Sequence, residues 1–331
     1  MTTHNSHRRW FHLTPNRFVI GLLVVECLFW LPSAAIHAQT PYGDQPAGSS
    51  AELLYQEVVV AQKSVCRVQG LDSRLDLRYS VLSSLAIDKR DNGRRDVKQK
   101  IEAATLLHAD EATQALFGDL LRKLTGTRFS MGFDSEGELV RFEGAKEKPQ
   151  AAGGAAVDQA LVLASLIDRD GWKELARSSF FRPRKPLRSD SRWQRSMTHR
   201  WGSLGSWTGQ VAYRYAGQQD GLQRFPYTFN LTYVAPKADA HDLLPISRAS
   251  FRHGEAGGTI YFDPGKGRVT RIEERFPVKG QMSIDVLGQS LPVELYEEQS
   301  FQVRLLESDP RSHRAMEPDH YGIRPKGEGK E

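Results

Sequence analysis

The stretch GGTIYFDPGKGRVTRIEERF, residues 257–276, decides between two kinds of structure. A loop that cradles phosphate has the pattern G-x-x-x-x-G-K-[ST] between a strand and a helix. Here Gly267 follows Lys266 where Ser or Thr is required, and Ile260 stands where the first glycine belongs. Asp263-Pro264-Gly265 is turn chemistry, because proline fixes φ and glycine accepts positive φ. The stretch therefore predicts a β-hairpin and not a nucleotide-binding loop.

Strand and turn signals continue on both sides of this hairpin. Upstream, Asn92-Gly93 is typical of a tight turn between two strands. Phe129, Met131 and Phe133 alternate before a return run, which predicts another hairpin. Further segments with strand character are residues 207–215, 227–233, 247–251, 258–262, 281–286 and 301–306.

Two segments have a helical pattern. Apolar residues recur at helical spacing between Asp110 and Gly126, with acidic residues early and basic residues late. The second segment, residues 155–180, is largely apolar, and a break is expected near Gly171. We therefore predict the α+β class, with one large curved antiparallel sheet and two main helices packed on it.

The N-terminal 38 residues have the layout of a secretory signal. Three arginines precede an apolar run from Phe18 to Leu31, and Pro32 ends that run. A cleaved signal peptide is the favoured interpretation of residues 1–38, and an uncleaved signal anchor is the alternative. The anchor is less favoured because a spanning helix would place Glu26 inside the bilayer. Either interpretation predicts export, to the periplasm or to the periplasmic face of the inner membrane, with membrane contact through this segment.

The rest of the chain is expected to form one domain. Residues 39–51 are rich in Pro, Gly and Ser and are predicted to be a flexible lead, residues 52–308 a single α+β domain, and residues 309–331 a disordered tail. The chain has 331 residues, of which 39% are hydrophobic, which excludes a wholly disordered protein. Cys66 is the only cysteine after residue 38, so no intramolecular disulfide is expected.

Charge gives little reason to expect nucleic acid as a partner. The formal charge of +5 includes three arginines and one glutamate of the leader, and without residues 1–38 it falls to +3. A nucleic-acid-binding domain is usually more strongly basic. We therefore predict no nucleic-acid partner.

The sequence has no recognisable catalytic, cofactor-binding or metal-binding motif. Neither H-E-x-x-H nor G-x-S-x-G occurs, and the histidines outside the leader are scattered. We therefore expect no catalytic residues, no cofactor and no metal. A hydrolase is the least favoured interpretation, and a cleft that gathers His199, His253 and several carboxylates would support it.

Two sets of side chains are candidates for binding. The first belongs to the basic run FFRPRKPLRSDSRWQRSMTHRW, residues 180–201, which is either a solvated connector or a contact for anionic lipid surfaces. Its candidate residues are Arg182, Arg184, Lys185, Arg188, Arg192 and Arg195. The second set is aromatic and either packs within the sheet or lines a site for an apolar ligand. Its candidate residues are Trp207, Tyr213, Tyr215, Tyr227, Phe229 and Tyr233.

Parts of the sequence resemble known groups of proteins. The leader RWFHLTPNRFVIGLLVVECLFW resembles the membrane-targeting N-termini of many planctomycete exported proteins. SRWQRSMTH, GSWTGQVAYRYAGQQDGLQRFPYTFNLTY and GGTIYFDPGKGRVTRIEERFPVKGQMSIDVLGQ resemble the uncharacterised bacterial domain family of unknown function 6263. The resemblance covers residues 65–306, most clearly 190–306. It implies an exported β-rich protein and supplies no catalytic residue.

We expect a non-enzymatic, exported envelope protein, and two mechanisms remain open. In the first, the helices close a sheet-lined cavity around a lipid or other apolar ligand. In the second, a structural or partner-binding envelope protein uses exposed sheet edges and the basic run. The expected partners are accordingly a lipid or an envelope protein, and the oligomeric state is left open.

Overall fold

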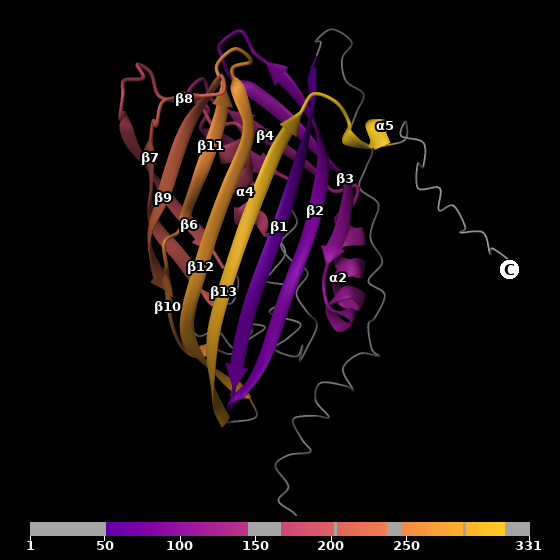
Figure 1. Cartoon of the computed structure of the whole chain (residues 1–331), viewed down its shortest axis with the longest axis vertical. Helices are drawn as coiled ribbons and strands as arrows, with labels where there is room; N and C mark the ends of the chain where they lie inside the picture. The colour runs from indigo at the N-terminus through magenta and orange to yellow at the C-terminus, as the bar shows by residue number, and fades with distance from the viewer. Residues whose placement is uncertain (1–50, 145–166, 202–203, 237–245, 287–288, 315–331) are drawn as a thin grey trace, which may run out of the picture.

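The computed structural model describes residues 51–144, 167–201, 204–236, 246–286 and 289–314 (Figure 1). These residues form a 13-stranded sheet. Its paired strands are antiparallel. Along the main path the strand order is β5-β4-β3-β2-β1-β13-β12-β11-β9-β7-β6, with β10 beside β12 and β8 beside β9. The large antiparallel sheet predicted from the sequence is therefore present.

Each strand-like segment named above lies within one of these strands, apart from Tyr215, which follows the end of β7. Their bounds are β1 Glu52–Val68, β2 Leu71–Lys89, β3 Arg95–His108, β4 Arg128–Phe133, β5 Leu139–Glu143, β6 Arg192–Arg200, β7 Ser206–Arg214, β8 Gln218–Gln219, β9 Leu222–Val234, β10 Ile246–His253, β11 Gly257–Asp263, β12 Arg268–Val286 and β13 Gln289–Leu306. The stretch 257–276 is the hairpin of β11 and β12, and the Asp263 carboxylate accepts hydrogen bonds from the backbone of its turn.

The sheet buries one face through the two-residue alternation of its strands. In β1, the side chains of Leu54, Val58 and Val60 are buried, whereas the intervening side chains are more exposed. β1 pairs with β13, so the first and last long strands lie side by side at the centre of the sheet (Figure 1). The buried face, called the inner face below, holds the core.

The helices agree with the prediction only in part. α2, Glu111–Leu124, lies where the first helix is expected, and Asp110 caps it by accepting a hydrogen bond from the backbone N–H of Thr113 at 2.9 Å. α4, Arg169–Ser179, covers the end of the second expected segment, whose residues 155–166 lie outside the described residues. A further helix of the described residues, α5, Pro310–Arg314, lies at the start of the segment expected to be a tail.

The interruption expected near Gly171 lies a few residues earlier: Ile167 and Asp168 are not helical, and α4 begins at Arg169 and runs through Gly171. Asp168, the N-cap, accepts a hydrogen bond from the backbone N–H of Gly171 at 2.7 Å, so the glycine lies in a capped first turn. No helix among the described residues is long and apolar enough to span a membrane. The predicted leader, residues 1–38, lies outside them.

Both longer helices pack on the inner face. The ring of Tyr79 on β2 lies 5.6 Å from that of Phe117 on α2, and the Tyr79 hydroxyl bonds to the backbone of Ile167, just before α4. α4 also contacts β12 and the two edge strands, β5 and β6. It therefore lies in the hollow of the curved sheet, behind β12 and β13 in Figure 1.

Buried hydrogen bonds fix the C-terminal end of α4 to the sheet. The Gln56 side chain donates to the hydroxyl of Ser179 at 2.7 Å, and the Gln99 side chain donates to Gln56 Oε1 and to Ser83 Oγ, both at 3.0 Å. Because buried polar groups are costly when unpaired, this network favours one position of the helix end.

Candidate functional site

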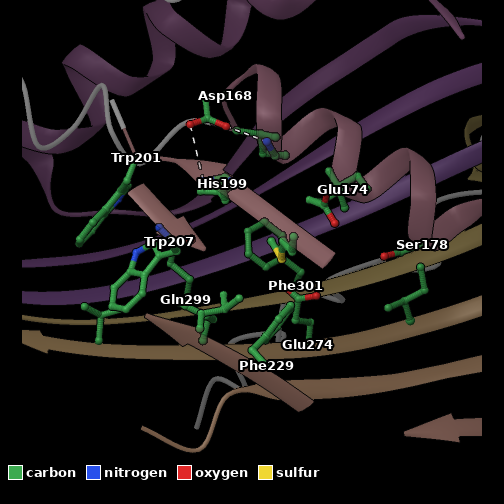
Figure 2. A pocket seen from close by; sticks show the side chains of 18 of the residues that line it. Asp168, Glu174, Ser178, His199, Trp201, Trp207, Phe229, Glu274, Gln299 and Phe301 are labelled. Carbon is green, nitrogen blue, oxygen red and sulfur yellow. Dashed lines mark hydrogen bonds and ion pairs between the residues drawn. The ribbon is translucent and has the colours of Figure 1, made fainter. Parts of the chain in front are cut away.

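A cavity of about 130 Å³ lies between α4 and the inner face of the sheet (Figure 2). The helix contributes Gly171, Glu174, Leu175 and Ser178. Most of the remaining wall consists of aromatic and aliphatic side chains. These side chains come from β6, β7, β9, β12 and β13 and from the residue directly after β6. They are Met197, Trp201, Trp207, Phe229, Leu231, Ile272, Phe276, Val278, Phe301 and Val303.

Glu274, on β12, brings a carboxyl group to this apolar wall. Its Oε2 accepts a hydrogen bond from the hydroxyl of Tyr227, on β9, at 2.5 Å. β11 lies between these two strands, and its Gly258 pairs in register with both residues. A Cβ atom at position 258 would lie 2.7 Å from the Tyr227 hydroxyl oxygen. The glycine therefore gives Tyr227 the room to reach Glu274.

Burial raises the pKa of Glu274 to about 7, because a charged carboxylate is poorly solvated in this setting. The hydrogen bond from Tyr227 and the charge of Arg195 offset part of this effect, whereas the nearby Glu174 carboxylate adds to it. Near neutral pH, Glu274 is therefore divided between its neutral and its charged form.

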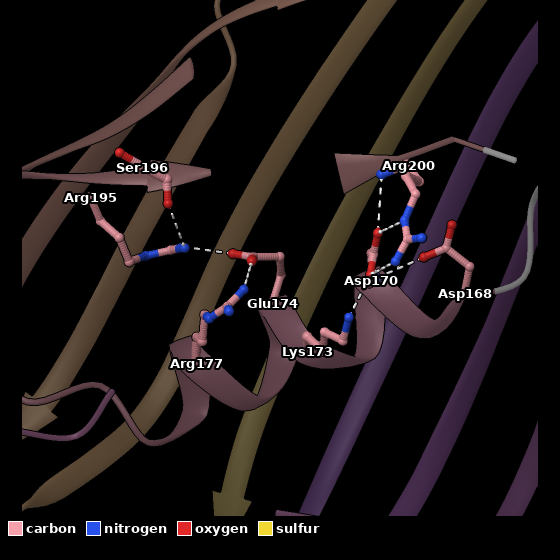
Figure 3. Close-up of polar contacts among 9 residues, drawn as sticks. Asp168, Asp170, Lys173, Glu174, Arg177, Arg195, Ser196 and Arg200 are labelled. Atoms are coloured by element: carbon pink, nitrogen blue, oxygen red, sulfur yellow. Dashed lines mark hydrogen bonds and ion pairs between the residues drawn. The ribbon is translucent and has the colours of Figure 1, made fainter. Parts of the chain in front are cut away.

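Glu174 lines the cavity and also contacts two arginines, Arg177 and Arg195 (Figure 3). Its carboxylate accepts a hydrogen bond from Arg195 Nη2 at 2.6 Å and another from Arg177. Burial lowers the pKa of Arg195, but the charges and hydrogen bonds of Glu174 and Tyr213 outweigh that effect and raise it above its usual value. Arg195 therefore stays charged and is held by the protein itself.

A second carboxylate contact lies at the N-terminal end of α4. His199 Nε2 is 3.8 Å from Asp168 Oδ2, and both side chains line the cavity. Ser178 also lines it, but seven residues of helix beyond Gly171, which is about 10 Å of rise. His253 is not a lining residue, and its ring meets the backbone of Leu231 and Gly254. The cavity therefore places His199 near the Asp168 carboxylate, but Ser178 in its lining lies far from these two side chains.

The six aromatic candidates have four different environments. Trp207 and Phe229 line the cavity. Tyr227 is not a lining residue, but its hydroxyl donates a hydrogen bond to Glu274, which is one. The Tyr233 hydroxyl donates to the backbone oxygen of Leu204 at 2.6 Å. Tyr213 and Tyr215 pack in a cluster with other rings at the Phe225 end of the sheet. Two of the six aromatic candidates therefore share the lining of this cavity.

The basic candidates do not form one surface. Residues 192–200 are the edge strand β6 and not a connector, and Arg195 is bound to Glu174. Arg182 donates to the backbone oxygen of Ser135 at 3.0 Å. Arg184, Lys185, Arg188 and Arg192 are exposed.

Part of this basic segment borders a second hollow, called the basic cleft. It has a volume of about 770 Å³. Its basic lining residues are Arg177, Arg182, Arg184, Lys185 and Arg195, and its aromatic ones are Phe181, Trp193, Tyr213 and Phe262. Arg188 and Arg192 are not among its lining residues.

Sequence reasoning missed the polar part of the cavity. Glu174 and Glu274 were not candidates, nor was Glu297, which is buried and accepts a hydrogen bond from Gln299 at 2.6 Å. One signal was available for β12. In the run Ile272 to Phe276, two-residue alternation places Glu274 on the face of its apolar neighbours.

Among the described residues, no group of three or more His, Cys, Asp and Glu side chains is arranged to hold a metal ion. Cys66 is buried on β1.

No protein-family model matches the chain, and no curated protein matches it. Among solved structures it is similar to a chain described as "Lipid-protein interactions in lipovitellin", at 11% identity and a TM-score of 0.38, covering 79% of this chain and 26% of that one. It is also similar to Pseudomonas aeruginosa OpdL, at 7% identity and a TM-score of 0.20, covering 77% of this chain and 99% of that one. A third similarity, to an acetoacetate decarboxylase-like enzyme from Sphingomonas wittichii RW1, has 12% identity and a TM-score of 0.11, covering 84% and 100% of the two chains.

The chain thus spans about a quarter of the lipovitellin chain that it matches. All three TM-scores lie below 0.5, so none of these likenesses carries an argument about function.

Proposed function

We propose that this protein binds a small apolar molecule, or the end of a lipid chain, in the cavity beneath α4. The observation that carries the proposal is the cavity itself, which has apolar walls from one helix and several strands. Protein cores rarely leave voids larger than a water molecule. Apolar walls of this kind favour an apolar ligand, because burying apolar surface contributes about 25 cal/mol per Å².

The size of the cavity limits the ligand. An engineered apolar cavity of about 150 Å³ binds benzene, and the present volume is similar. The part of the ligand inside is therefore about the size of one aromatic ring or a few chain carbons.

The proposal includes the setting expected from the leader. The protein acts as a non-enzymatic, exported binding module, in the periplasm or on the periplasmic face of the inner membrane. Its ligand there is a lipid or another apolar compound of the envelope.

The first experiment is native mass spectrometry of the full chain, expressed with export and purified without detergent. We expect a small apolar molecule at one copy per chain, which solvent extraction then releases for identification. Added toluene tests binding directly, by isothermal calorimetry and by the rise in unfolding temperature. A clean apo mass together with no toluene binding would overturn the proposal.

Two matched substitutions locate the binding. Leu175 on α4 and Leu120 on α2 are both half-buried helix residues, but only Leu175 lines the cavity. Leu175→Trp fills part of the hollow and is expected to abolish toluene binding, whereas Leu120→Trp keeps it. Equal loss in both variants would show that the effect comes from general destabilisation.

A second proposal concerns the basic segment. Arg184, Lys185 and Arg188 are exposed, and no ion pair links them to another described residue. Free cations of this kind favour contact with an anionic lipid surface. The partner-binding alternative, through the sheet edges β5 and β6, would take first place if the cavity binds nothing.

A further inference from the structure

The ionisable groups that line the cavity are mostly acidic. Carboxyl groups of Asp168, Glu174, Glu274 and Glu297 line it. Among the described lining residues, neither lysine nor arginine is present, and His199 is the only basic side chain. An anionic ligand would therefore meet acceptors and no permanent cation.

Glu274 is the acceptor best placed to meet a ligand. Its Oε2 is occupied by the Tyr227 hydroxyl, whereas Oε1 has no hydrogen-bond partner among the described residues. The side chain lines the cavity, as Phe276 does, and lies close to Phe229 and Phe301 in Figure 2. A ligand seated against these rings would bring its polar end to a free carboxyl oxygen.

The groups around Glu274 leave that oxygen without a cation of its own. From α4 comes Glu174, from β9 Tyr227, and from β6 Arg195. Arg195 donates to Glu174 at 2.6 Å and lines the basic cleft instead of the cavity. Gly258 of β11 and Phe301 of β13 are its register partners on the neighbouring strands, and neither carries a charge.

We propose that the ligand of this cavity is an apolar molecule whose polar end donates a hydrogen bond, a hydroxyl or an ammonium group, to Glu274, and that anions of the same shape are excluded. This inference rests on the proposed apolar binding function and adds the class of ligand. Its physical reason is that a buried ligand anion would lie beside carboxyl groups without a cation to pair with.

Three probes with one shared ring test the inference on the full chain at pH 7. Benzyl alcohol and benzylamine end in a donor, and benzoate ends in an anion. Isothermal calorimetry is expected to give dissociation constants for the first two at least about tenfold lower than for benzoate. Benzoate binding as tightly as the other two would overturn the inference.

Toluene separates the two levels of the proposal, because it has the ring but no polar end. Binding of toluene without preference among the three polar probes overturns the ligand class and leaves the apolar cavity standing. Absence of binding for all four probes overturns both.

The pH dependence of benzylamine binding tests the role of Glu274 separately. Between pH 6 and pH 8, benzylamine remains protonated while Glu274, with a pKa of about 7, gains most of its charge. The affinity of the wild-type protein for benzylamine is therefore expected to rise about tenfold from pH 6 to pH 8, whereas its affinity for toluene should change little. Glu274→Gln should remove this rise and keep toluene binding. A persistent rise in the variant would exclude Glu274 as the acceptor.

Two further variants guard against a folding defect. Glu255→Gln changes an exposed carboxylate and should leave the benzylamine profile as in wild type. Tyr227→Phe removes the hydrogen bond that lowers the pKa of Glu274, so the midpoint of the profile should move to higher pH. An unmoved midpoint would contradict the assignment even if Glu274→Gln were unstable.

Discussion

Asp170 joins the first turn of α4 to Arg200, the last residue of the edge strand β6 (Figure 3). Asp170 Oδ2 accepts hydrogen bonds from Arg200 Nε at 3.0 Å and from the Arg200 backbone N–H at 3.2 Å. Lys173 Nζ donates to the other oxygen at 2.9 Å. Together with the bonds of Ser179 at the opposite end, this contact holds the helix over the cavity.

Asp170→Asn is expected to destabilise the protein by about 2 kcal/mol, the usual contribution of hydrogen bonds to a charged and largely buried group. Urea unfolding at pH 7 measures this loss, and hydrogen exchange should show faster opening of α4. Asp76→Asn is the control, because Asp76 and its partner Lys63 are both more than half exposed. Equal effects of the two substitutions would contradict an anchoring role.

The pKa of Asp170 also predicts how the stability of the protein changes at acidic pH. Burial would raise the pKa of Asp170, but the hydrogen bonds from Arg200 and Lys173 outweigh burial and hold the pKa well below its ordinary value of 3.8. Its contribution to stability is thus present above that ordinary value and is lost as the pH falls below it. The difference in unfolding free energy between wild type and Asp170→Asn should shrink there.

The raised pKa of Glu274 predicts the opposite dependence of stability on pH. Its pKa is raised from 4.5 to about 7 on folding, so the folded state holds a proton that the unfolded state releases. The associated stability is fully present below about pH 4.5 and is lost as the pH rises through 7. Relative to Glu274→Gln, wild type should lose about 3 kcal/mol across this window, at about 1.4 kcal/mol per pKa unit. Parallel pH profiles of urea unfolding for the two proteins would contradict the shift.

Gly258→Ala is expected to cost about 2 kcal/mol or more. The added Cβ would lie 2.1 Å from the backbone oxygen of Glu273 and 2.7 Å from the Tyr227 hydroxyl, so the strands must move apart. Thermal unfolding measures the loss. Gly118→Ala on α2 is the control, because its Cβ meets only the flexible side chain of Arg122 at 3.8 Å and alanine favours a helix. A Gly258→Ala variant as stable as Gly118→Ala would show that this packing is not required.

Reversing the charges of Arg184, Lys185 and Arg188 to glutamate should weaken binding to phosphatidylglycerol vesicles by about 100-fold, since each cation near an anionic surface contributes about 1 kcal/mol. Cosedimentation measures the binding. The control reverses Lys98, Lys123 and Arg252, which are exposed on other elements. Equal losses in both triple variants would indicate a general charge effect, and unchanged binding would remove the membrane-contact proposal.

The local elements could be predicted because their signals are local. The alternation of Phe129, Met131 and Phe133 became β4, and the spacing between Asp110 and Gly126 became α2. The second helical segment was expected to break near Gly171, and the structure begins α4 slightly earlier, at Arg169, after the Asp168 cap. Aspartate is a preferred N-cap residue because its carboxylate accepts a hydrogen bond from the backbone of the first turn, so Asp168 was the local signal for the exact start.

By itself, the sequence determined the hairpins, α2 and the β-rich character of the chain, because turn chemistry and hydrophobic periodicity act over a few residues. Only the tertiary structure decided that β1 pairs with β13 and that α4 lies in the hollow of the sheet. The cavity, and the meeting of Tyr227 with Glu274 across Gly258, follow from that arrangement. Such contacts depend on strand order and register between distant segments, and no pattern within a short stretch of sequence specifies them.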